Sequence, residues 1–336
     1  MTVAVDFGPM TVRTDPLAGD VRAEDFEQYR RELTGYCYRM LGSVFEADDA
    51  VQETMVRAWR GAASFEGRSA VRSWLYRIAT NVCLDLLRGR QRRARPMELG
   101  PAWTVDSFTG EKLPEHAWMQ PIPDDRVVPT DGDPAEVAEA RESIRLAFVT
   151  ALQSLPARQR AVLILREVLR WQAAEVAELL DTSVASVNSA LQRARATLAA
   201  QDAQAPVEPV PADQQELLAR YVDAFERYDI ESLVKLLRED AIMSMPPYNF
   251  WLQGPAEMGR WFVGPGSGCE GSRLVPLAAN GSAAFGSYRS DGQGGHVAFA
   301  IQVIETSGDR IVGHHNFVDT SLFAAFGLPL RLDPQP

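Results

Sequence analysis

Hydrophobic residues recur every three to four positions over two stretches of the chain, and this period predicts two helical domains. In residues 24–95 one stripe places Val51, Met55, Ala58 and Trp59 at i, i+4, i+7 and i+8. A second stripe runs over four turns: Val71, Trp74, Leu75, Ile78, Ala79, Val82 and Leu86. The helical period resumes from about Pro134 to Ala200. We therefore expect a first helical domain over residues 24–95 and a second over residues 140–203, after an N-terminal tail, residues 1–23.

The remaining segments have a different pattern. Residues 96–139 are rich in proline and glycine and carry ten acidic residues against Lys112 and Arg126, a net charge of -8, which favours an extended acidic linker. Residues 204–212 have the proline content of a semi-rigid spacer. From residue 213 a helical stretch is followed by short alternating runs that glycine-rich turns separate. This pattern predicts an antiparallel sheet, so residues 213–336, the tail, should form an α+β domain.

Charge is distributed unevenly along the chain. The 336 residues carry a formal net charge of -11, which argues against a protein that simply coats a polyanion. Between Arg68 and Arg95, however, eight arginines stand against one acid, Asp85. A local cationic patch in an acidic chain indicates a local site for a polyanion.

Several classes of protein are disfavoured by what the sequence contains. The three cysteines, Cys37, Cys83 and Cys269, form no CxxC pair, which favours a reducing cytoplasm. Residues 1–20 do not resemble a signal peptide, and no apolar run approaches a membrane span, so we expect a soluble cytoplasmic protein. The histidines lack metal-ligand spacing, so neither a metal nor a cofactor is expected. His314 and His315 should lie on a strand with one side chain facing in and one facing out.

Residues 172–198 match the pattern of a helix-turn-helix. Asp181–Thr182 makes the turn, after which Val184, Val187, Leu191, Ala194 and Leu198 form an inward stripe. Short polar groups and a guanidinium then point outward: Ser186, Ser189, Gln192 and Arg193. Such groups can approach base edges and phosphates in a major groove. An ordinary helical hairpin is the alternative.

The helix around residues 74–81 carries an aromatic and basic surface. Trp74 lies on the apolar stripe and should be partly buried, whereas Tyr76 and Arg77 lie off it. Aromatic rings beside arginines can stack unpaired bases while the arginines hold phosphates. Asn81 could read a base edge or bond locally. The run Arg88, Arg90, Arg92, Arg93 and Arg95 could contact DNA phosphates or be a solvated helix end.

Four segments in order resemble the bacterial extracytoplasmic-function (ECF) sigma factors of the sigma-70 family. They are the acidic Asp48–Asp49–Ala50–Val51–Gln52–Glu53, the loop Phe65–Ser69, the helix Trp74–Asn81, and Leu155–Pro156–Ala157–Arg158–Gln159–Arg160 followed by the helix-turn-helix. The tail resembles a SnoaL-like (NTF2-like) cone, and the fusion is similar to the SigG-type subgroup. The implied fold is two all-α sigma domains, region 2 and region 4, followed by an α+β SnoaL-like domain.

The resemblance implies a promoter-specificity subunit of RNA polymerase with no catalysis of its own. Asp48, Asp49, Gln52 and Glu53 would bind the clamp helices of the largest polymerase subunit. The −10 element would be melted and held by residues from the loop, the helix and the arginine run: Phe65, Arg68, Ser69, Trp74, Arg77, Asn81, Arg88, Arg90, Arg92 and Arg93. Ser186, Ser189, Gln192 and Arg193 would read the −35 element. The family often has a basic residue near Asn188 or Ala190, and this chain has none there.

The tail is expected to regulate the sigma domains in cis, with a small ligand or an anti-sigma protein as a possible partner. An enzymatic tail is the alternative from another class, and it would use Asp229, His296, His315 or Asp319. A third alternative, an ordinary operator-binding activator, leaves the surface around Trp74 unexplained. No membrane partner is expected.

Overall fold

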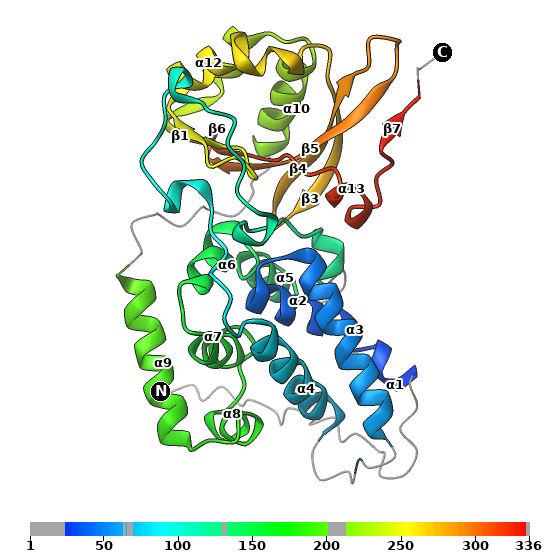
Figure 1. The fold of residues 1–336 in the computed structure, drawn as a ribbon, viewed down its shortest axis with the longest axis vertical. Helices are drawn as coiled ribbons and strands as arrows, with labels where there is room; N and C mark the ends of the chain where they lie inside the picture. Colours follow the sequence, from blue (N-terminus) through cyan, green and yellow to red (C-terminus); the bar gives the residue numbers. More distant parts are fainter. Residues whose placement is uncertain (1–23, 63–64, 66–69, 130–132, 201–212, 334–336) are drawn as a thin grey trace, which may run out of the picture.

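The computed structural model describes residues 24–62, 65, 70–129, 133–200 and 213–333. The helices of residues 24–200 gather in one half of the molecule, and the sheet lies in the other half together with the helices of residues 213–333 (Figure 1). The expected order, two helical domains followed by an α+β domain, is confirmed.

The first helical domain consists of α1 (Glu24–Glu27), α2 (Arg30–Leu41), α3 (Val44–Gly61) and α4 (Val71–Leu86). Gly42 ends α2 in the left-handed conformation, with φ of 71°, and its amide donates to Tyr38 O at 2.7 Å. Ser43 then caps α3 by accepting a hydrogen bond from the Glu46 amide. The adjacent residues Gly42 and Ser43 therefore end α2 and start α3, respectively.

The second helical domain contains α5 (Pro134–Glu142), α6 (Leu146–Gln153), α7 (Ala157–Leu163), a π-helical turn (Ile164–Val168), α8 (Ala173–Leu179) and α9 (Val184–Ala199). Asp181 has φ of 48° in the turn between α8 and α9, and Ser183 caps α9. The predicted helix-turn-helix is therefore present.

The tail is a curved sheet with helices on its inner face and one short helix on its outer face. Its strands are β1 (Leu237–Ser244), β2 (Trp251–Gln253), β3 (Arg273–Ala279), β4 (Ser282–Ser290), β5 (His296–Ser307), β6 (Arg310–Phe317) and β7 (Arg331–Leu332). The order is β2-β1-β6-β5-β4-β3, with β7 on β5, and only the β1–β6 pair is parallel. The helices on the inner face are α10 (Asp213–Glu226), α11 (Ile230–Lys235) and α12 (Pro255–Val263), and the short α13 (Leu322–Ala325) lies on the outer face. Most connections are hairpins, which is why the alternating runs could be recognised in the sequence.

Aromatic rings fill the space between α10, α12 and the sheet. The Tyr221 ring lies 5.6 Å from Phe285 and 5.8 Å from Phe225, and Phe225 lies 6.2 Å from Phe262. His314 projects into this layer, 5.7 Å from the Tyr221 ring. The inner face of the tail is thus a packed aromatic core.

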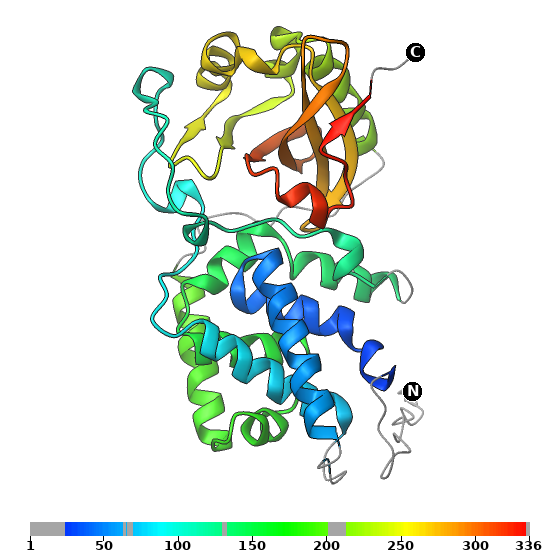
Figure 2. The same cartoon turned by 45° about the vertical axis from the view of Figure 1, so that its right-hand side comes forward.

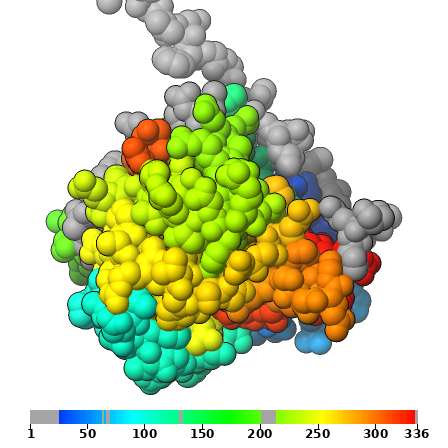
Figure 3. All heavy atoms as spheres, turned by 90° about the horizontal axis from the view of Figure 1, so that it is seen from above, coloured from blue at the N-terminus to red at the C-terminus, as the bar shows by residue number. Residues whose placement is uncertain are grey.

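The linker differs from the expected extended spacer. It forms short 3-10 turns (Pro96–Glu98, Val105–Ser107, Glu115–Ala117, Asp124–Arg126) and packs on both halves of the molecule (Figure 2). Trp103 and Phe108 pack against the aromatic core of the tail, whereas Met119 and Ile122 are buried with the helical domains. Seen from above, the linker lies against the segment that carries α12 (Figure 3). The linker packs on both halves because apolar residues are interspersed among its acidic residues, and burial of these apolar side chains is favourable.

The outer face of the sheet is covered rather than exposed. His315 and Phe317 on β6 are buried on that face, and Phe317 belongs to the same apolar cluster as the helical domains. His314 and His315 do lie on opposite faces of β6, as expected, but neither is exposed, because α13, the linker and the helical domains lie over the second face.

Candidate nucleic-acid interface

The acidic face of α3 is only partly open. Asp49 and Gln52 are exposed, and Glu53 pairs with Arg57 one turn later at 2.7 Å. Asp48 instead forms a two-pronged ion pair with Arg126 of the linker. The linker therefore occupies one edge of the surface predicted to bind polymerase.

The aromatic residues of α4 are more buried than the sequence pattern indicates. Trp74 is half-buried, as expected, and packs on Phe26 and Phe65, with ring centroids 6.0 and 4.9 Å away. Tyr76 is fully buried between Tyr36, at 5.2 Å, and Trp171 of the second helical domain, at 5.0 Å. The prediction that Tyr76 is free to stack on bases is therefore wrong in this arrangement. Trp171 adds an apolar partner that the period of α4 alone does not reveal.

Arg77 and Asn81 are exposed on α4, as predicted. Arg77 donates a 3.1 Å hydrogen bond to the Glu178 carbonyl on α8 and lies 3.7 Å from the Glu178 carboxylate. Arg68 and Ser69 lie outside the described residues. Arg77 of the predicted −10 surface thus contacts the first helix of the helix-turn-helix.

The arginine run divides into exposed and buried residues. Arg88 and Arg92 are exposed, and Arg90 pairs with Glu46. Arg93 is buried, pairs with the same Glu46 carboxylate at 2.8 Å, and donates to the Trp118 carbonyl at 2.6 Å. The assignment of Arg93 to DNA phosphates is corrected here, because its guanidinium holds the linker.

The helix-turn-helix presents the expected polar face. Val187, Leu191 and Ala194 are the buried residues of α9. The residues predicted to read DNA, Ser186, Ser189, Gln192 and Arg193, are all exposed. Val184, placed in the inward stripe by its spacing, is 44% exposed because it is the first residue of the helix. The spacing therefore identifies the outward face of α9 but not its first turn.

The two helical domains pack directly against one another. Arg39 on α2 donates to the Ser143 carbonyl at 3.0 Å, and Gln153 on α6 donates to the Arg39 carbonyl at 3.2 Å. Arg160 on α7 donates to the Met40 carbonyl. The guanidinium of Arg72 lies over the Trp171 ring, 5.5 Å from its centroid. The sequence analysis missed these contacts, because their partners are about 100 to 120 residues apart and many are backbone carbonyls.

One turn of the tail joins three parts of the molecule. Asn280, between β3 and β4, donates to the Tyr38 hydroxyl at 2.7 Å and to the Ile144 carbonyl at 2.6 Å. Its side-chain oxygen accepts from the Ile122 amide of the linker at 3.0 Å. Asn280 is fully buried with φ of 54°, a conformation that asparagine tolerates better than most residues. Although Asn280–Gly281 is recognisable as a turn, its role in joining domains is not visible in the sequence.

Asp124 of the linker bonds to Gly281, the residue that follows Asn280 in the turn between β3 and β4. Its carboxylate accepts a 2.8 Å hydrogen bond from the Gly281 amide. Burial raises the pKa of Asp124, which shows that this carboxylate is drawn away from water. Gly281 has φ of 68°, and a Cβ there would lie 2.7 Å from the Arg141 carbonyl. This position therefore requires glycine both for backbone geometry and for close approach.

The four residues nominated for an enzymatic tail do not come together. Asp229 caps α11, and Asp319 accepts from the Ser321 amide. His296 bonds to the Gly271 carbonyl, whereas His315 lies between Ser244, at 2.8 Å, and Glu305, at 3.3 Å. Each residue has a local partner in a different part of the tail.

Within the described residues there is no cluster of three or more histidine, cysteine or acidic side chains suited to a metal ion. None of the described helices is long and apolar enough to span a membrane.

Comparisons with known proteins agree with this arrangement. Residues 26–93 match the sigma-70 region 2 family model, and residues 145–198 match the sigma-70 region 4 model. The chain is 45% identical over 327 residues to the ECF RNA polymerase sigma factor SigG of Mycobacterium tuberculosis, covering 94% of this chain and 85% of that protein. It is 31% identical to SigJ of the same organism, covering 66% of this chain and 63% of SigJ. The crystal structure of SigJ superimposes with a TM-score of 0.58 and 23% identity, covering 92% of this chain and all of that chain, so the fold extends through the tail.

Proposed function

This chain belongs to the ECF RNA polymerase sigma factors, and on that premise we propose that its tail holds region 2 (the first helical domain) and region 4 (the second) in an inactive, closed arrangement. The observation that carries the proposal is the set of hydrogen bonds made by Asn280. A single side chain of the tail contacts Tyr38 in region 2, Ile122 in the linker and Ile144 in region 4. Loss of Asn280 would remove one hydrogen bond to each region and would weaken the arrangement that the direct contacts between the two regions also hold.

The closed arrangement covers surfaces that a sigma factor needs. Arg77, which we assign to the −10 strand, is bonded to region 4, and Arg126 of the linker covers Asp48 on the face that we assign to polymerase. A phosphate or base of the melted strand would have to replace Glu178 of α8 as the partner of Arg77. Polymerase binding at Asp48 would displace Arg126 of the linker, and the linker also contacts the tail. Binding to core polymerase and opening should therefore be coupled.

In the open form we assign the exposed polar residues as follows. Asp49, Gln52 and Glu53 bind core polymerase, with Asp48 joining them once Arg126 leaves. Trp74, Arg77 and Asn81 act on the −10 element with the loop that carries Phe65, while Arg88, Arg90 and Arg92 hold phosphates. Ser186, Ser189, Gln192 and Arg193 enter the major groove at the −35 element. The cytoplasm, which holds polymerase and promoter DNA, is then the place of action.

A catalytic role for the tail is disfavoured by the separation of its nominated residues. His315 is the one with a chain of polar partners, and that chain lies on the covered face of the sheet. We therefore propose that the tail has a regulatory rather than an enzymatic role, with a ligand or an anti-sigma protein acting by shifting the closed arrangement.

The test is promoter-directed transcription with purified core polymerase and limiting sigma factor. Asn280→Gly removes the three side-chain contacts and keeps a residue that tolerates φ of 54°. Gln293→Gly is the matched control, because it removes an exposed side chain from another turn of the tail. We expect Asn280→Gly to raise transcript yield several-fold at unchanged start sites, and Gln293→Gly to change nothing. Equal transcript yield from Asn280→Gly and the unaltered chain would contradict the proposal that the Asn280 contacts hold the closed arrangement, which we call the Asn280 clamp.

A further inference from the structure

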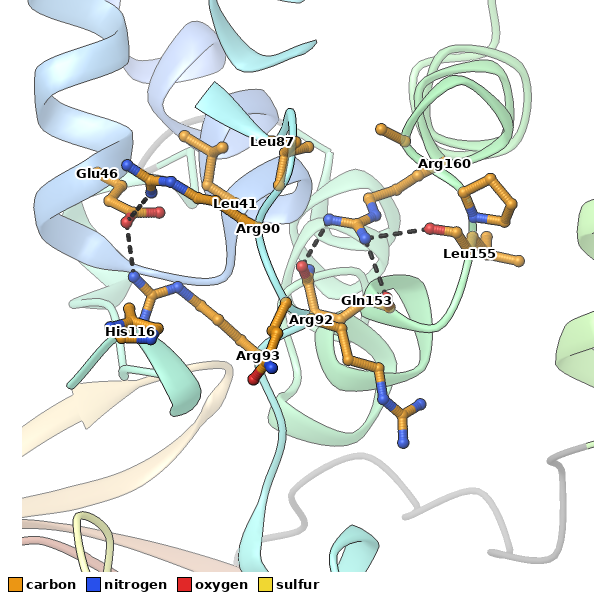
Figure 4. A pocket seen from close by; sticks show the side chains of 13 residues that line it. Leu41, Glu46, Leu87, Arg90, Arg92, Arg93, His116, Gln153, Leu155 and Arg160 are labelled. Atoms are coloured by element: carbon orange, nitrogen blue, oxygen red, sulfur yellow. Dashed lines mark hydrogen bonds and ion pairs between the residues drawn. The ribbon is translucent and has the colours of Figure 1, made fainter. Parts of the chain in front are cut away.

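A cavity lies where region 2, the linker and region 4 meet (Figure 4). It has a volume of about 210 Å³. The charged and imidazole side chains that line it come from all three parts: Glu46, Arg90, Arg92, Arg93, His116 and Arg160. The cavity is therefore formed only when the two regions are packed together.

The wall of this cavity has an excess of positive charge. Four arginines line it with a single carboxylate, Glu46, and that carboxylate is shared by Arg90 and Arg93. Arg92 is exposed and has no hydrogen-bonding or ionic partner within the described part of the chain. The imidazole of His116 adds a further potential donor from the linker side.

Arg160 is the most unusual of these residues. Its side chain is buried, and its two terminal nitrogens donate to neutral oxygens, namely the carbonyls of Met40 and Leu155 and both oxygens of Gln153. Its Nε has no hydrogen-bond partner, and no carboxylate neutralises it among the described residues. Burial lowers the pKa of Arg160 to about 10, which reflects the free energy of holding this charge away from water. A buried cation without a counter-ion stabilises an anion placed beside it.

We propose that this cavity binds a small multivalent anion of the oligophosphate class, such as a diphosphate group. Arg92 and His116 would contact it from the open side, and Arg160 would supply the buried positive charge. A volume of about 210 Å³ leaves room for a small anion such as a diphosphate. Arginine forks match phosphate oxygens in geometry as well as in charge.

Binding would favour the closed arrangement. The anion would lie between Arg92 of region 2 and the buried charge of Arg160 in region 4, so it would bind the closed form more tightly than an open one. It also occupies Arg92, which we assign to promoter phosphates. By reciprocity, polymerase and promoter DNA would weaken anion binding as much as the anion weakens theirs.

The test is isothermal titration of the full chain, without polymerase, with inorganic diphosphate at constant ionic strength. Sulfate serves as the anion control. Arg92→Gln removes an exposed guanidinium, so the variant should fold. Arg158→Gln is the matched control, because Arg158 is an exposed arginine on α7 that does not line the cavity.

We expect saturable binding of diphosphate, tighter than that of sulfate, with Arg92→Gln weakening it about tenfold or more. Arg158→Gln should leave the affinity unchanged. Absence of saturable binding would overturn the proposal, as would equal weakening by Arg92→Gln and Arg158→Gln, or equal affinity for sulfate. Because the titration contains neither polymerase nor DNA, it can fail while the clamp by Asn280 stands, and the reverse also holds.

Discussion

Asn280 of the tail donates a 2.7 Å hydrogen bond to the hydroxyl of Tyr38 in region 2, across 242 residues of sequence. Tyr38 in turn donates to the Gln120 carbonyl of the linker at 2.8 Å. Both side chains are fully buried. The tail, the linker and region 2 are therefore joined by one continuous hydrogen-bonded path, and this path is the structural basis of the proposed clamp.

The first prediction concerns exchange of the linker amides. The Ile122 amide donates to the Asn280 side chain, so Asn280→Gly should leave this amide without its partner. Loss of buried hydrogen bonds of this kind costs about 1–3 kcal/mol. We expect faster hydrogen exchange in peptides spanning residues 118–128, measured by mass spectrometry. Protection equal to that of the Gln293→Gly control would show that the Asn280 contacts add no stability.

The second prediction concerns promoter melting. Arg77 and Asn81 are exposed on α4, so replacing both with alanine should leave region 2 folded. We expect the double variant to lose permanganate reactivity at the −10 element while still binding core polymerase, because the two side chains act on DNA. Asp85→Ala on the same helix is the control. Normal melting by the folded double variant would remove Arg77 and Asn81 from the −10 site.

The third prediction separates the arginines by their exposure. Each phosphate contact that is lost should reduce the slope of log affinity against log salt by about 0.9. We expect this reduction for Arg92→Ala, whose side chain is exposed. Arg93→Ala should instead destabilise the fold by about 1–3 kcal/mol, because it leaves the buried Trp118 carbonyl without its 2.6 Å partner.

Filter binding over a salt series, paired with thermal unfolding, distinguishes the two arginines. The assignment fails if Arg92→Ala keeps the full salt slope or if Arg93→Ala melts at the same temperature as the unaltered chain.

The fourth prediction concerns acid stability of the tail. Burial, and secondarily the neighbouring His315, lower the pKa of His314 to about 3. The Tyr221 hydroxyl donates to Gln302 at 2.8 Å, so the 2.8 Å contact between Tyr221 and His314 requires a proton on Nε2 of the neutral ring. The unfolded chain binds the extra proton near pH 6.5, whereas the folded chain resists it. The stability is therefore present above pH 6.5 and is lost as the pH falls toward 3.

One such group contributes a slope of about 1.4 kcal/mol per pH unit within that window. We expect the unfolding free energy of His314→Gln, measured by urea titration, to fall less steeply between pH 6 and 4. The difference in slope from the unaltered chain should be up to about 1.4 kcal/mol per pH unit. His296→Gln, at a surface histidine of the same domain, should keep the full pH dependence. Identical pH profiles for His314→Gln and the unaltered chain would mean that His314 is not held neutral.

The sequence pattern predicted those features that depend on neighbours in the chain. The helical period located α3, α4 and α9, and the alternation of Ser186, Ser189 and Arg193 with the buried stripe placed the polar face of the helix-turn-helix correctly. The hairpins of the tail were recognisable for the same reason. Local periodicity is set by which face of an element is buried, and this is written in consecutive residues.

Contacts between domains could not be predicted from the local periodicity of the sequence. Tyr76 lies off the apolar stripe of α4 and is nevertheless buried, because Trp171 arrives from another domain. Arg93 looks like a DNA-binding residue in a basic run, yet its position is set by Glu46 and the Trp118 carbonyl. The pairing of Asn280 with Tyr38 joins residues whose neighbours give no signal of each other. Such partners are specified by the packing of whole domains.

The most direct test of the closed arrangement is the distance between regions 2 and 4 in solution. Spin labels can be placed at Arg60→Cys, at the end of α3, and Ala199→Cys, at the end of α9, because both positions are exposed and Cys37, Cys83 and Cys269 are buried. Double electron–electron resonance should give one narrow distance distribution for the chain alone and a longer one after core polymerase is added. Asn280→Gly should populate longer distances without polymerase. The same distribution with and without core polymerase would contradict the account.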